Sequence, residues 1–116
     1  MSYRFVDARE IEPRLGVLRP LRRALEIESF GINEITLGPN ATTYPEHDER
    51  KTGQDELYVV LEGDAVMTID GEQLEMRPGR YIFVTPESKR HIAPGAEGIR
   101  FVAFGAQASG HHGGRH

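Results

Sequence analysis

Hydrophobic and polar positions alternate in short runs along most of this chain, from Ser29 onward. Between Phe30 and Leu37, apolar side chains are spaced by glycine and polar residues, and a nearly continuous apolar run occupies 57–61. Further short runs lie at 66–69, 73–76, 81–84 and 99–104. Alternation is typical of a strand with one buried face, whereas a short continuous run indicates a strand buried on both faces. The pattern therefore predicts an all-β domain.

Turn residues separate these runs at regular intervals. Asp70-Gly71 lies between two runs and is a strong signal for a two-residue hairpin loop, and Pro78-Gly79 marks the next turn. Short strands every eight to twelve residues, divided by such turns, are typical of a β-sandwich or a barrel.

The two ends of the chain follow other patterns. We expect a short strand around Tyr3 to Val6, then a helical turn that begins near Pro20 and lies outside the barrel. Residues 106–116 contain glycine, alanine, serine and histidine without core-forming side chains, which predicts a flexible Gly/His tail. The expected organisation is one domain over 1–105, with a barrel core at about 29–105.

Composition narrows the function classes. The chain of 116 residues has a net charge of −4 and no cysteine, which excludes disulfides and thiolate metal sites. The mixed charges argue against nucleic-acid binding, and the single basic cluster (Arg19, Arg22 and Arg23) is interpreted as a solvated helix face.

No apolar run reaches transmembrane length, and the N-terminus lacks the apolar core of a signal peptide. We therefore expect a cytoplasmic protein without a membrane or nucleic-acid partner.

Two stretches carry the candidate chemistry. The first contains Gly38, His47, Glu49 and Glu56, with Gly63 seven residues after Glu56. The second is the Pro78-Gly79 turn followed by Pro86, Arg90 and His91. Together they resemble the two motif blocks of the cupin superfamily, and the chain is similar to small, uncharacterised bacterial single-domain cupins. The resemblance implies a double-stranded β-helix, a jelly-roll barrel of about eight or more strands.

The resemblance also shows where this chain departs from the family. Cupins carry two histidines one residue apart in the first block; here His47 stands for the first, and Glu49 takes the place of the second. The last histidine corresponds to Arg90 when counted from Gly79, and to His91 when counted from Pro86. Strand alternation allows only one of these neighbours to face the interior, and an inward Ile92 favours Arg90.

Two site hypotheses follow and remain open at this point. With His91 inward, the imidazoles of His47 and His91 and the carboxylate of Glu56 would hold a divalent transition metal such as Zn, Mn, Fe or Ni. With Arg90 inward, its fixed charge opposes metal binding and would pair with a glutamate or bind an anionic ligand. The three remaining histidines, His111, His112 and His116, lie in the tail.

The favoured function is a small-molecule-binding cupin of unassigned substrate with an incomplete metal-ligand set. Its ligand pocket is formed by His47, Glu49, Glu56, Tyr58 and Arg90. The alternative is a metal-dependent enzyme of the dioxygenase or isomerase type, and a purely structural role is the third reading; the fold does not choose among them.

We also expect a homodimer. Small single-barrel cupins commonly pair, and the N-terminal segment has apolar residues that one small barrel does not fully cover: Phe5, Val6, Leu15, Val17 and Leu18.

Overall fold

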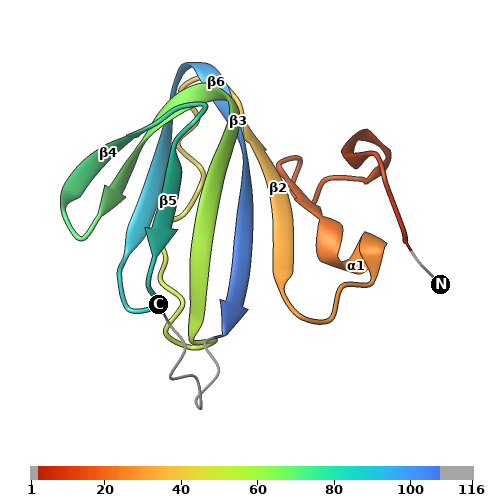
Figure 1. Ribbon diagram of the computed structural model, residues 1–116. Helices are drawn as coiled ribbons and strands as arrows, with labels where there is room; N and C mark the ends of the chain where they lie inside the picture. The colour runs from red at the N-terminus through yellow and green to blue at the C-terminus, as the bar shows by residue number, and fades with distance from the viewer. Residues whose placement is uncertain (1–2, 108–116) are drawn as a thin grey trace.

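The computed structural model describes residues 3–107, which fold into a curled antiparallel sheet with one short α-helix beside it (Figure 1). In chain order the elements are η1 (Ala8–Glu10), β1 (Leu18–Pro20), α1 (Leu21–Leu25), β2 (Gly31–Leu37), β3 (Gln54–Ile69), β4 (Glu72–Met76), β5 (Tyr81–Val84) and β6 (Arg90–Gln107). The sheet order is β1-β2-β6-β3-β4, with β5 paired to β3. The prediction of an all-β domain with a short N-terminal helical turn is confirmed.

Strands β3 and β6 are long and pair with each other along most of their length. The pairing shifts register between Val60 and Glu62 and again between Gly63 and Ala65, and such bulges bend a strand. Gly63 has φ of 79°, and a side chain there would clash with the carbonyl of Gly98. Each bent strand passes through both halves of the barrel, so the described residues form six strands instead of eight or more.

The hairpin predicted at Asp70-Gly71 joins β3 to β4, where Ile69 pairs with Glu72. Asp70 and Gly71 have φ of 48° and 89°, as a two-residue hairpin loop requires. The hairpin prediction is confirmed, and β5 has the bounds that its apolar run indicated.

The strand expected around Tyr3 to Val6 is absent from the structure, and that prediction was wrong. Instead, the Arg4 guanidinium donates hydrogen bonds to the carbonyls of Leu25 and Glu26, at 2.7 and 3.2 Å. These bonds tie the segment to the end of α1 and not to a sheet edge. A single 3-10 turn, η1, follows.

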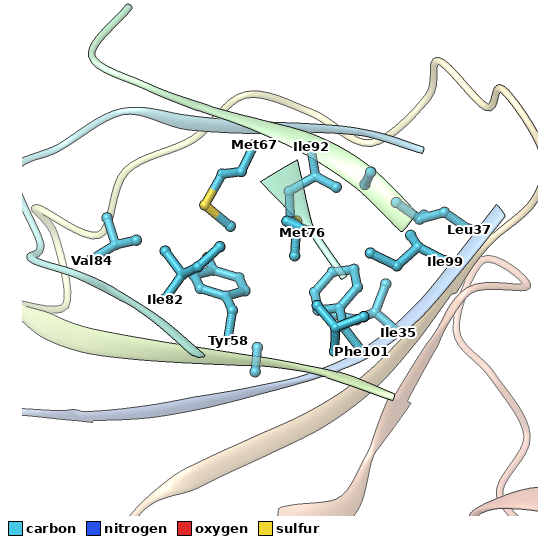
Figure 2. Packing of buried hydrophobic residues seen from close by; sticks show 13 residues of the cluster. Ile35, Leu37, Tyr58, Met67, Met76, Ile82, Val84, Ile92, Ile99 and Phe101 are labelled. Atoms are coloured by element: carbon cyan, nitrogen blue, oxygen red, sulfur yellow. The ribbon is translucent and has the colours of Figure 1, made fainter. Parts of the chain in front are cut away.

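The core lies between the two walls of the barrel. Figure 2 shows buried side chains from opposite strands pointing toward one another, with Tyr58 of β3 and Phe101 of β6 as the large aromatic members. The remaining members are Ile35, Leu37, Val60, Ala65, Met67, Met76, Ile82, Val84, Ile92, Ile99 and Ala103.

The last strand extends further along the chain than the sequence predicted. Strand β6 continues through Ala106 and Gln107, which pair with Asp55 and Gln54, so the first two residues of the predicted tail belong to the sheet. The rest of that predicted tail, 108–116, lies outside the described residues.

Within 3–107, no helix is long and apolar enough to cross a membrane.

Candidate functional site

The segment between β2 and β3 brings His47 to the start of β6. The backbone N–H of His47 donates to the carbonyl of Arg90 at 3.0 Å, and the Arg90 N–H donates back to the His47 carbonyl at 2.9 Å. This isolated antiparallel bridge attaches an otherwise irregular segment to a strand. It therefore holds the imidazole of His47 at the mouth of the barrel.

Strand alternation on β6 decides between Arg90 and His91. Arg90 is 0% exposed and Ile92 is also buried, while His91 between them is half-buried. Successive side chains on a strand point to opposite faces, so Arg90 and Ile92 face the interior and His91 faces outward. The structure does not bring His91 to His47 and Glu56, and the three-residue metal set that includes His91 is not formed.

Glu56 lies at the centre of the site. Its Oε1 atom accepts hydrogen bonds from the Tyr58 hydroxyl at 2.5 Å and from Nη1 of Arg90 at 3.0 Å. Nε2 of His47 lies 3.7 Å from the same oxygen and 3.3 Å from Oε2 of Glu49. The five residues of the predicted pocket thus form one connected cluster.

The backbone of Glu49 is held by the connection between β5 and β6, and one of its carboxylate oxygens is held by the loop that follows Glu49. Its N–H donates to the carbonyl of Pro86 at 2.8 Å, and its Oε1 accepts from the Thr52 hydroxyl at 2.9 Å. The other oxygen, Oε2, faces His47. Glu49 therefore belongs to the cluster around Glu56.

The Arg90 guanidinium has little freedom. Nη2 donates to the Thr85 carbonyl at 2.6 Å, Nη1 donates to Glu56, and Nε is buried without a partner among the described residues. A buried charge needs a hydrogen-bonded counter-charge, and Glu56 supplies it. Arg90 therefore holds the Glu56 carboxylate in place from the buried side of the site.

The cluster changes the pKa of its acids and bases. Burial raises the pKa of Glu56, but the nearby imidazole of His47, the hydrogen bond from Tyr58 and the charge of Arg90 together outweigh burial and lower the pKa. The nearby carboxylate of Glu56 raises the pKa of His47 above its usual value, against a smaller opposite effect of burial. Glu56 is therefore ionised at neutral pH, and His47 keeps its proton to a higher pH than an ordinary imidazole does.

The two tyrosines of the site stay protonated. Burial, followed by the charge of Glu56, raises the pKa of Tyr58 strongly. The same two causes raise the pKa of Tyr44 to about 12. Both phenols therefore remain hydrogen-bond donors throughout the physiological range.

The donor atoms of the site have the spacing that a bound metal ion requires, but the charge of Arg90 opposes a second cation there. One donor atom each from His47, Glu49 and Glu56 lies within 4.8 Å of the others. Ligands that surround one ion at ~2.0–2.2 Å lie at separations of that order. However, Oε1 of Glu56 already accepts two hydrogen bonds, and the fixed charge of Arg90 lies 3.0 Å from it. Among residues 3–107, a single imidazole belongs to this donor set. These features oppose tight binding of a transition metal.

Sequence reasoning missed two contributors to the site. Tyr44 lies edge-on to His47 and to Phe101, with ring centroids 6.1 and 6.3 Å apart, and so connects the site to the core. Thr85 contributes only its main-chain carbonyl. Every residue carries such a carbonyl, so no sequence signal could have identified Thr85.

The fold and the site define a cupin-type barrel, and comparison with known proteins gives the family. A family profile described as "Cupin domain" matches residues 33–105, so the chain belongs to the cupin family.

Solved structures share this fold. A cupin protein from Bacteroides fragilis superposes with a TM-score of 0.76 at 22% identity, covering 97% of this chain and 91% of that chain. The polyketide cyclase RemF from Streptomyces resistomycificus gives a TM-score of 0.73 at 20% identity, covering 90% and 80%. At these identities the likeness concerns the fold alone.

One curated relative is similar over a shorter stretch. Dimethylsulfoniopropionate lyase DddW from Ruegeria pomeroyi is 37% identical over 54 residues, which is 47% of this chain and 36% of the relative. The match thus covers only about a third of that enzyme's length.

Proposed function

We propose that this chain is a small-molecule-binding cupin whose ligand contacts His47, Glu49 and Glu56 at the mouth of the barrel. The observation that carries the proposal is the fully buried Arg90, which stands where the cupin resemblance expects a histidine ligand. Its guanidinium is a permanent positive charge beside Glu56. The site therefore has a built-in cation in the region where a metal cupin places its ion.

The position of Arg90 also narrows the ligand class. Arg90 is bonded to Glu56 and Thr85 and has no exposed surface, so a ligand does not reach it without displacing Glu56. The groups that keep some exposure are the imidazole of His47 and the carboxylates of Glu49 and Glu56. Carboxylates accept hydrogen bonds and attract positive charge. The supported ligand is a small molecule that offers amine or hydroxyl donors to these carboxylates.

A matched panel of small amines, polyols and carboxylates tests this. Donor-rich compounds should raise the melting temperature of the wild-type chain, because a ligand that binds only the folded state stabilises it. Glu49→Gln should weaken binding at least about 10-fold, since hydrogen bonds to a charged group contribute about 1.5–3 kcal/mol. His91→Gln, on the opposite face of β6, is the control and should bind normally. Binding confined to carboxylates, or unaffected by Glu49→Gln, would contradict the proposal.

The second candidate is a metal-dependent enzyme, of the dioxygenase or isomerase type expected from the sequence or a lyase like the relative. The spacing of the His47, Glu49 and Glu56 donors favours it. A bound divalent metal would supply a Lewis acid that polarises a substrate oxygen. Turnover of dimethylsulfoniopropionate by the chain with added zinc, manganese, iron or nickel would support this candidate. Turnover that survived Glu49→Gln would exclude this donor set.

A further inference from the structure

A second cleft lies between the sheet and the N-terminal segment, and no residue of the cluster at the barrel mouth lines it. Four strands contribute one side chain each: Arg19 of β1, Glu34 of β2, Glu62 of β3 and Arg100 of β6. The segment 5–9, drawn in red in Figure 1, forms the other wall. We call this hollow the arm cleft. Its volume of about 850 Å³ is in the range of ~300–1,000 Å³ that ligand pockets have.

Three arginines and three acids line the arm cleft, and most of these charges already have partners. Nε and Nη2 of Arg9 donate to the two carboxylate oxygens of Asp7, at 3.1 and 2.7 Å. Nε of Arg100 donates to the carboxylate of Glu62 at 2.9 Å. One cation and one anion of the six remain without a close counter-charge, and they lie on the neighbouring strands β1 and β2.

Arg19 is the remaining cation. Its Nε donates to the carbonyl of Ile11 at 3.1 Å, and within residues 3–107 its two terminal nitrogens have no hydrogen-bond or ion-pair partner. Glu34 is its cross-strand neighbour in the sheet, but the two side chains form no ion pair with each other. The terminal nitrogens of Arg19 are therefore donors that a ligand in the arm cleft can use.

Glu34 is the remaining anion, and it is only 9% exposed. Its Oε2 accepts from Nη1 of Arg100 at 3.4 Å, which is longer than the ~2.7–2.9 Å of a charge-assisted hydrogen bond. No other residue in 3–107 donates to this carboxylate. A carboxylate with so little access to water normally accepts several hydrogen bonds. Glu34 therefore has acceptor capacity that a donor in the cleft can fill.

These two groups require a ligand that carries both charges. A simple anion would meet three acids in the arm cleft, and a simple cation would meet three arginines, so a zwitterion fits best. The two charges of the ligand must also be close together, because Arg19 and Glu34 pair across neighbouring strands, where Cβ atoms lie ~4.5–5.5 Å apart. Phe5, which is 84% exposed, and Val6 add an apolar surface to the same cleft.

We propose that the arm cleft is a second ligand site and that it binds a zwitterionic α-amino acid with an apolar side chain. The α-carboxylate accepts hydrogen bonds from the terminal nitrogens of Arg19, and the α-ammonium donates to Glu34. The side chain of the ligand lies against Phe5 and Val6. An α-amino acid carries both charges on one carbon, which matches their spacing in the cleft. The site uses none of the residues at the barrel mouth.

Calorimetric titration of the full chain with leucine tests the proposal. Leucine should bind, and glycine should bind more weakly because it has no side chain to cover Phe5. Leucinamide lacks the carboxylate and N-acetylleucine lacks the ammonium, so each should bind at least about 10-fold more weakly than leucine. Absence of leucine binding at millimolar concentration would overturn the proposal. Equal binding of leucine and either derivative would also overturn it, because the ligand would then be a simple cation or a simple anion.

Two variants match the two derivatives. Arg19→Met should weaken leucine binding at least about 10-fold and leave leucinamide binding unchanged, because leucinamide has no carboxylate for Arg19. Glu34→Gln should weaken leucine binding similarly and leave N-acetylleucine binding unchanged. Arg23→Met removes an exposed arginine outside the arm cleft and is the control, which should bind leucine normally. Melting curves establish that each variant is folded, and unchanged leucine binding in a folded Arg19→Met or Glu34→Gln variant would contradict the proposal.

Glu49→Gln separates the arm cleft from the barrel mouth, where amine donors are proposed to bind. Loss of leucine binding in Glu49→Gln but not in Glu34→Gln would place leucine at the mouth and would contradict the arm cleft as its site. Loss in Glu34→Gln alone supports the arm cleft. That result does not depend on whether any ligand binds at the mouth, so the two proposals fail separately.

Discussion

The barrel interior has two parts that are built on the same strands by different means. In the apolar part, Met67, Met76 and Phe101 are fully buried and are held by packing alone. In the charged part, at the mouth, Glu56 and Arg90 are held by a few specific hydrogen bonds. Tyr58 belongs to both, because its ring packs on Phe101 while its hydroxyl bonds to Glu56. Packing tolerates changes of shape, whereas a buried charge depends on each of its partners.

The largest effect is expected where a charge is forced into the apolar part. Val60→Lys places an unpaired ammonium opposite Phe101 and should cost about 4 kcal/mol or more, most of the stability of a small domain. Glu62→Lys lies beyond the bulge that turns Glu62 to the exposed face of β3. It replaces an exposed ion pair with Arg100 by two exposed positive charges and should cost about 1 kcal/mol or less. Urea unfolding followed by circular dichroism measures both. Equal losses of stability in the two variants would contradict the placement of Val60 on the buried face of β3 and of Glu62 on the exposed face.

The next effect comes from breaking the charged part. Arg90→Met leaves Glu56 as a largely buried carboxylate without its fixed counter-charge and should cost about 3 kcal/mol. Adding Glu56→Gln to that variant removes the stranded charge and should recover part of the loss. Arg50→Met, which removes a guanidinium from the exposed surface, is the control and should cost less than about 1 kcal/mol. A double variant less stable than Arg90→Met alone would contradict the pairing of Arg90 with Glu56.

The smallest effect is the pH dependence of the charged part. The pKa of His47 is raised in the folded state by the nearby carboxylate of Glu56. Its stabilising contribution is therefore complete below the ordinary value of 6.5 and is lost as pH rises through the folded pKa. The free energy of unfolding of the metal-free chain should fall as pH increases above about 6.5. His47→Gln should remove this slope, and the outward-facing His91→Gln should retain it. An unchanged slope in His47→Gln would exclude His47 as its source.

The two parts also differ in how far the sequence predicts them. The apolar part follows from periodicity: the runs at 57–61, 66–69 and 81–84 all lie in strands of the sheet, and Asp70-Gly71 is a hairpin. Periodicity did not predict where the strands end or that the runs at 57–61 and 66–69 belong to one long strand. The bends at Val60 and Gly63 that join them depend on how β3 pairs with β6.

The charged part was only partly predictable. The motif spacing indicated His47, Glu49 and Glu56 as candidates, and alternation with Ile92 favoured an inward Arg90. The buried carbonyl partner of Arg90 and the contact of Tyr44 with His47 come from the path of the segment between β2 and β3. Local residue patterns do not encode that path. The strand expected near Tyr3 failed for a similar reason, since the contacts of Arg4 with the end of α1 are remote in sequence.

The central claim is that the charge of Arg90 takes the place of a metal ion at the mouth of the barrel. Metal analysis tests it most directly, on a chain truncated after Gln107 so that His111, His112 and His116 do not contribute. After exposure to zinc, manganese or nickel and dialysis, the truncated wild-type chain should retain little metal and show no rise in melting temperature. Arg90→His removes the fixed charge and adds a second imidazole, so it should retain metal and melt higher. Stoichiometric metal retained by the truncated wild-type chain would contradict the account.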